Sequence, residues 1–192
     1  MTAILSLLFI LLFPAPGISL DCIHAPCKII ALDAPFRETV YDLDRYLKRE
    51  TNADAVKEIV QNNLKFNLKV ITIKTSPSWL NNGSKFKEVI GLAPDVIVMH
   101  TSTFYSPRGV QITIDNLQRS LKYFADHSTA EILLYGSHFT PLGGLDRYKK
   151  FLIRMIPGLK GRFTLIQIPS RTFKGPKTEK TVISAMRQIF EK

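Results

Sequence analysis

Five short apolar segments recur along the chain, and each is followed by polar or turn residues and then by a segment with helical spacing. They lie at residues 28–32, 68–73, 95–99, 131–135 and 163–168. Stretches such as PDVIVMH and AEILLYG are continuously apolar, as expected of strands that helices cover on both faces. The pattern predicts an α/β fold, a three-layer α/β/α sandwich with a five-stranded parallel sheet and helical crossovers.

Apolar residues at steps of three and four predict the helices. The clearest stripe runs from Val110 through Leu117 to Phe124 and predicts one long amphipathic helix that packs on the sheet. Asn52 is a suitable N-cap for a helix after the first strand. For the sheet we expect the doubly wound strand order 2-1-3-4-5. The other expected helices cover residues 41–49, 53–64, 84–92, 145–155 and 178–190.

The N-terminal part of the chain predicts export. Residues 4–13 are uncharged and predominantly apolar, and a Pro-Ala-Pro-Gly segment and Ser19 follow them. As a helix, a segment this short spans only about half of the ~30 Å hydrocarbon layer, so a transmembrane anchor is disfavoured. We expect residues 1–19 to be a signal peptide and residues 20–192 to form one periplasmic or secreted α/β domain. Because no Lys or Arg precedes the apolar segment, a retained membrane-associated leader is the alternative.

Both cysteines, Cys22 and Cys27, stand immediately before the first predicted strand. In an oxidising compartment they are expected to form a disulfide that ties the start of the mature chain to the sheet. Lipid modification of Cys22 is disfavoured, because Leu20 and Asp21 are not the small residues that a lipoprotein cleavage site requires. A metal site that includes His24 would lack a fourth ligand, so we expect no metal.

The formal net charge of the chain is +10. This charge favours contact with anionic surfaces, such as an acidic glycan or a membrane surface. Nucleic acid is disfavoured as a partner, because export would separate the protein from it. The basic residues are spread along the chain, so a solvated basic surface is the alternative, and the sequence leaves the oligomeric state open.

Polar residues follow several of the predicted strands. The carboxyl ends of parallel strands meet at one edge, so Asp33 and His100 should approach each other on neighbouring strands. Together with a serine they have the parts of a nucleophilic site, while turn capping or a hydrogen bond to the backbone is the structural alternative. The candidate catalytic residues are Asp33, His100, Ser102, Ser137 and His138, and the candidate ligand-binding residues are Thr101, Thr103 and Arg171.

Two common motifs are missing from the sequence. The first strand is followed by LDAPFRE and not by G-x-G-x-x-G, which argues against dinucleotide binding, and we expect no cofactor. The chain also contains no G-x-S-x-G nucleophile elbow.

The order of the elements and three segments resemble the SGNH, or GDSL, hydrolases. IIALDAPF stands where that family has its nucleophile block, PDVIVMHTSTF where it has its third-strand block, and IPSRTFKGPKTEKTVISAMRQIF where it has its C-terminal acid and base. The resemblance covers residues 28–190. It implies a flavodoxin-like α/β fold and ester hydrolysis as the activity of the family.

The residues at the catalytic positions of that family differ in this chain. Ala34 stands at the nucleophile position, Ser102 replaces the glycine and Phe104 replaces the asparagine of the third block, and Arg171 and Phe173 or Lys174 stand at the acid and base positions. We therefore expect an exported SGNH-like domain that binds an envelope glycan or another anionic ligand at the carboxyl edge of the strands. An atypical hydrolase of an acylated carbohydrate or a small ester is the alternative.

Overall fold

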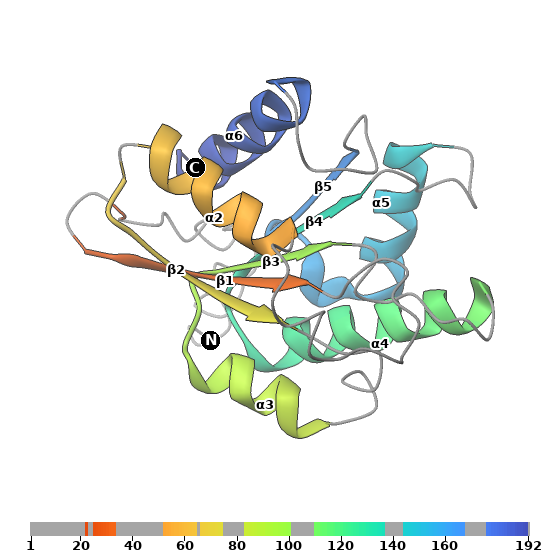
Figure 1. The fold of residues 1–192 in the computed structure, drawn as a ribbon. Coiled ribbons are helices and arrows are strands. Elements are labelled where there is room, and N and C mark those ends of the chain that lie inside the picture. Colours follow the sequence, from red (N-terminus) through yellow and green to blue (C-terminus); the bar gives the residue numbers. More distant parts are fainter. Residues whose placement is uncertain are drawn as a thin grey trace, which may run out of the picture.

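The structure, a computed structural model, describes residues 22, 25–33, 52–64, 66–74, 83–100, 110–136, 144–167 and 176–191. Its five strands form one parallel sheet of order β2-β1-β3-β4-β5, which confirms the predicted fold class and strand order (Figure 1). This is the flavodoxin-like topology. The strands are β1 (Cys27–Asp33), β2 (Leu68–Lys74), β3 (Val96–His100), β4 (Glu131–Gly136) and β5 (Phe163–Gln167).

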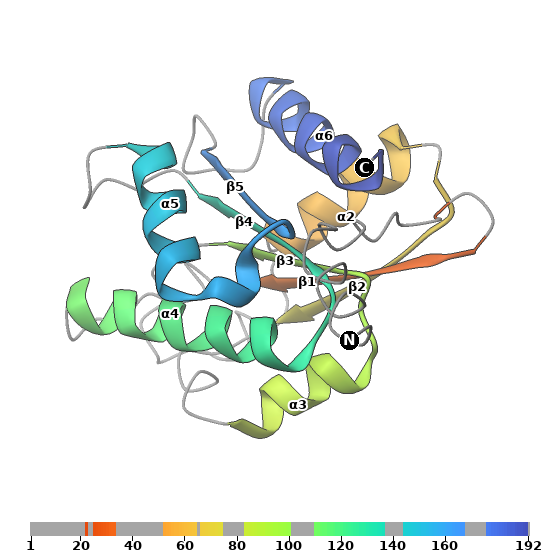
Figure 2. The same cartoon turned by 180° about the vertical axis from the view of Figure 1, so that it is seen from behind.

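Helices cover both faces of the sheet (Figures 1 and 2). One hydrophobic core lies under α3, α4 and α5, and the other lies under α2 and α6. The helix expected at residues 41–49 lies outside the described residues. The described helices are α2 (Asn52–Asn63), α3 (Gly83–Gly91), α4 (Val110–His127), α5 (Leu145–Met155) and α6 (Pro176–Phe190), and a 3-10 turn, η4 (Pro157–Leu159), follows α5.

Strand β3 shows why the strand segments are continuously apolar. All of its residues are buried, because successive side chains point to opposite faces and each face carries a helical layer. Ile97 and Met99 join the core under α4, whereas Val96 and Val98 join the core under α6. Burying each such side chain contributes roughly 1.5–3 kcal/mol, so the alternation stabilises both layers at once.

The predicted disulfide is confirmed: Cys22 is bonded to Cys27 at the start of β1. Both cysteines are buried in the core under α2 and α6. The backbone around them is paired to the residue before β2, since Asn67 N donates to Cys22 O and Cys27 N donates to Asn67 O, each at 2.9 Å. The disulfide therefore fastens the beginning of the domain to the amino-terminal edge of the sheet.

The expected signal peptide lies outside the described residues. Within the part of the chain that the structure describes, no helix has both the length and the apolar character needed to cross a membrane. Export of the protein stays a prediction.

Candidate functional site

Strand order brings two of the predicted site residues to neighbouring positions. The last β1–β3 pair is Leu32 with Met99, so Asp33 and His100 are the next residues of two adjacent strands. On its other side, His100 is paired with Tyr135 of β4. His100 therefore stands between the carboxyl ends of β1 and β4, at the edge of the sheet where ligands of this topology bind.

The His100 side chain is buried, with 4% of its surface exposed. Its ring lies against the ring of Tyr135, with 4.9 Å between the ring centroids. Burial lowers the pKa of His100 from 6.5 to about 4, because the cation loses its hydration. The imidazole is therefore neutral at pH 7, and it is a weaker general base than one whose pKa is close to the working pH.

The remaining candidates lie outside the described residues. These are Thr101, Ser102, Thr103, Ser137, His138 and Arg171, and for Asp33 only the backbone is described. The structure thus brings together the strand ends that carry Asp33 and His100. The catalytic and ligand-binding roles of all these residues stay predictions.

A groove lies beside the carboxyl end of the edge strand β5, between this strand and α6. Its volume is about 780 Å³. Ile166 and Ala185 provide its apolar part, and Lys177 and Lys180 provide two ammonium groups. The other lining residues are Gln167, Thr181, Ser184 and Gln188.

The polar residues of the groove form one stripe on α6. Positions 177, 180, 181, 184 and 188 fall within roughly 100° of one another around the helix, while Val182, Met186 and Ile189 pack in the core. This stripe was not predicted from the sequence, although its spacing is visible once the buried positions of α6 are removed. The stripe resembles an ordinary solvated helix face until β5 is placed next to it.

The electrostatics of the groove favour an anion. Among the described residues, neither Lys177 nor Lys180 forms an ion pair, and both side chains are exposed. They lie in the first turns of α6, where the helix dipole also favours negative charge.

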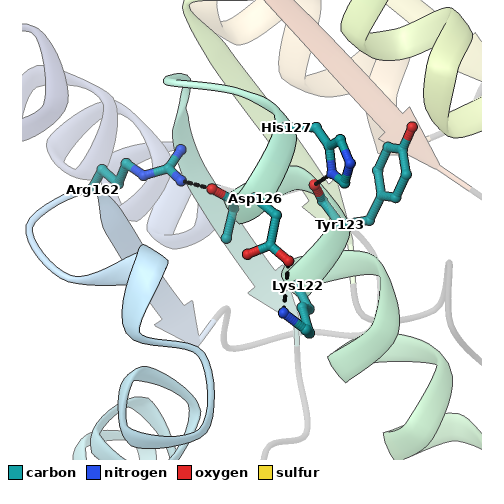
Figure 3. Close-up of polar contacts among 6 residues, drawn as sticks. Lys122, Tyr123, Asp126, His127 and Arg162 are labelled. Carbon is teal, nitrogen blue, oxygen red and sulfur yellow. Dashed lines mark hydrogen bonds and ion pairs between the residues drawn. The ribbon is translucent and has the colours of Figure 1, made fainter.

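A second polar cluster, centred on Arg162, lies at the amino-terminal ends of the strands, opposite to the end that carries the groove (Figure 3). Its guanidinium binds the carbonyl groups at the end of α4 and in the following turn. Desolvation lowers the pKa of Arg162, and the charges of Glu131 and Asp126 oppose that shift. Nε donates to Gly158 O at 2.7 Å, Nη1 donates to Ser128 O at 2.6 Å and to Ala130 O at 3.0 Å, and Nη2 donates to Ala125 O.

Glycine at position 158 allows the turn after α5 to approach α4 this closely. A Cβ atom at Gly158 would lie 3.2 Å from the Cβ of Ala125 and 3.3 Å from its carbonyl oxygen. A larger residue there would push the turn away from the helix end that Arg162 caps.

A cavity of about 800 Å³ adjoins Arg162, but the charged side chains that line it have partners. Asp95 accepts a hydrogen bond from the backbone N–H of Lys28 at 2.7 Å, and Asp126 pairs with Lys122 at 2.6 Å. Figure 3 shows the second of these contacts beside His127. Among the residues that the structure describes, no three His, Cys, Asp or Glu side chains are grouped to hold a metal ion. We assign this cluster a structural role.

Topology and geometry define the class of this protein as a flavodoxin-like parallel α/β domain with a basic groove at the carboxyl edge of its sheet. No protein-family model matches the sequence, and a search of curated proteins finds no significant match.

Proposed function

We propose that the protein is an exported binding domain of SGNH-like fold that holds an anionic glycan of the cell envelope in the groove between β5 and α6. The observation that carries this proposal is the polar stripe of α6, whose two lysines have no ion-pair partner among the described residues. Export follows from the apolar leader in the sequence and supplies the oxidising compartment that the Cys22–Cys27 disulfide requires.

The lining of the groove suits an acidic sugar. Ammonium groups bind carboxylate or sulfate groups, and the hydroxyl and amide groups of Thr181, Ser184 and Gln188 can hydrogen-bond to sugar hydroxyls. Ile166 and Ala185 offer an apolar surface to the C–H face of a sugar ring. A groove of about 780 Å³ has the size of a small-ligand site and suits a few sugar units of a longer chain.

Binding to an acidic oligosaccharide tests the proposal. We expect an oligogalacturonate to bind with measurable heat in isothermal titration calorimetry, and a neutral gluco-oligosaccharide of the same length to bind at least tenfold more weakly. Lys177→Gln with Lys180→Gln should lower the affinity about tenfold, since each of the two exposed charged contacts contributes roughly 0.2–1 kcal/mol.

The matched control is Lys69→Gln with Lys87→Gln. Both residues are exposed. Lys69 lies on β2, the edge strand farthest from β5, and Lys87 lies on α3, so this variant removes the same net charge away from the groove. The control should bind like the wild type. Equal weakening in both double variants, or no weakening in either, would show that the groove is not the site.

An atypical ester hydrolase is the second candidate, because the ends of β1 and β3 bring Asp33 and His100 to adjacent positions. Ser102 or Ser137 would be its nucleophile. The low pKa of His100 and the loss of the family residues at positions 34 and 104 argue for binding without turnover. We expect no hydrolysis of short-chain p-nitrophenyl esters above the buffer rate; turnover that disappears in Ser102→Ala or Ser137→Ala would favour the enzyme.

A further inference from the structure

Helix α5 carries a row of cations on its outer face. Four of its residues are basic and one, Asp146, is acidic. Arg147, Lys150 and Arg154 are all exposed, and their positions lie within about 60° of one another around the helix. Among the described residues, none of these three cations forms an ion pair.

Packing fixes the direction in which this row points. Tyr148 and Leu152 are buried in the core that α5 shares with α4 and the sheet, so the opposite side of the helix faces outward. Figure 2 shows α5 at the periphery, in the same layer as α4. The three cations therefore project together from one convex surface of the domain.

An exposed apolar side chain is the last residue of α5, roughly 80–100° around the helix from Arg147 and Arg154, so it lies beside their row. Met155, directly after Arg154, is 56% exposed, and within the described part of the chain it is the only large apolar residue with such exposure. On a surface that rests on lipid headgroups, cations meet phosphate and neighbouring apolar side chains enter the interface, and an exposed thioether beside the cations can do so.

We propose that the cationic outer face of α5, defined by Arg147, Lys150 and Arg154 and bordered by Met155, docks the protein on an anionic phospholipid surface. This contact is separate from the groove of α6 and does not rest on glycan binding. A convex helix face with a straight row of cations fits an extended charged plane better than it encloses a soluble ligand.

Vesicle flotation tests the proposal. We expect the purified protein to float with vesicles of 70% phosphatidylcholine and 30% phosphatidylglycerol, and to stay unbound with pure phosphatidylcholine vesicles. Arg147→Gln with Lys150→Gln and Arg154→Gln should lower the partition coefficient at least tenfold. The matched control, Lys57→Gln with Lys69→Gln and Lys87→Gln, removes three charges from α2, β2 and α3 and should retain most of the binding.

A second variant reports on the contact itself. Met155→Trp keeps the cations, and its fluorescence emission, compared with that of the wild type, should shift to the blue only with the anionic vesicles. Equal loss of flotation in the two triple variants, equal binding to neutral vesicles, or an unshifted Met155→Trp spectrum on bound vesicles would each overturn the assignment. Thermal melts of all variants keep loss of folding apart from loss of binding, and retained glycan affinity in the α5 variant shows that the groove acts independently.

Discussion

The two edges of the sheet use their polar groups in different ways. At the amino-terminal end of the strands, Arg162, Asp95 and Asp126 bind groups of the protein itself, so their hydrogen-bonding capacity is used within the fold. Near the carboxyl edge, Lys177 and Lys180 project into a groove without an ion-pair partner among the described residues. The difference indicates that the first edge contributes stability, whereas the second is available to a ligand.

Replacing Arg162 should cause the largest effect. Arg162→Ala removes charge-assisted hydrogen bonds to four carbonyl groups, and we expect the free energy of unfolding to fall by about 3 kcal/mol. Urea unfolding followed by circular dichroism measures this loss. Arg187→Ala, which removes an exposed arginine from α6, should cost less than about 0.5 kcal/mol, and equal losses in the two variants would remove the contrast between the edges.

The disulfide provides a second test at the amino-terminal edge. Cys22→Ser with Cys27→Ser opens a small loop, and we expect a loss of about 2 kcal/mol, because the unfolded chain gains conformational freedom. Urea unfolding of the wild type in a reducing buffer should give the same midpoint as the variant. A wild type that is insensitive to reductant would contradict the proposed contribution.

At the carboxyl edge, His100 should make stability depend on pH. Its pKa is about 4 in the folded protein and 6.5 in the unfolded chain, so the unfolded state binds the proton more tightly. The contribution of neutral His100 to the free energy of unfolding is therefore complete above pH 6.5 and is lost as the pH falls towards 4. Between pH 7 and pH 5 we expect a loss of about 2 kcal/mol that His100→Gln does not show, measured by urea unfolding at both values. Parallel pH profiles of the two proteins would contradict this origin.

The smallest effect is expected at the surface of α4. Lys122 and Asp126 pair at 2.6 Å, but their side chains are 66% and 44% exposed, so water and salt weaken the attraction. Lys122→Ala should change the free energy of unfolding by about 0.5 kcal/mol or less in a urea titration. A larger loss would mean that Asp126, which also faces Arg162, takes part in the structural cluster at this edge.

Sequence reasoning predicted the sheet well because strand burial leaves a local pattern. The apolar runs around Val98 and Leu133 predicted buried strands, and the stripe from Leu145 to Met155 has the bounds of α5. The 3-10 turn at Pro157–Leu159 was not predicted, because a single turn has no periodicity.

The two polar clusters were harder to predict because their partners are distant in the sequence. Arg162 binds backbone carbonyl groups, which every residue has, so no residue type marks them. Lys177 and Lys180 become part of a groove only when β5 lies beside α6. The neighbouring backbone positions of Asp33 and His100 were predictable, because strand order alone determines them, whereas the burial of His100 against Tyr135 depends on side-chain packing.

The contacts of Arg162 also have a consequence for the order of assembly during synthesis. The residue that caps the end of α4 lies 37 positions after Ala125 in the chain, so a ribosome has produced all of α4, β4 and α5 before the cap exists. Until then the last turn of α4 keeps unsatisfied carbonyl groups and should fray. Docking of β5 would then add the last strand to the sheet and cap α4 in the same event. The C-terminal end of α4 therefore becomes fully ordered only after β5 has been synthesised.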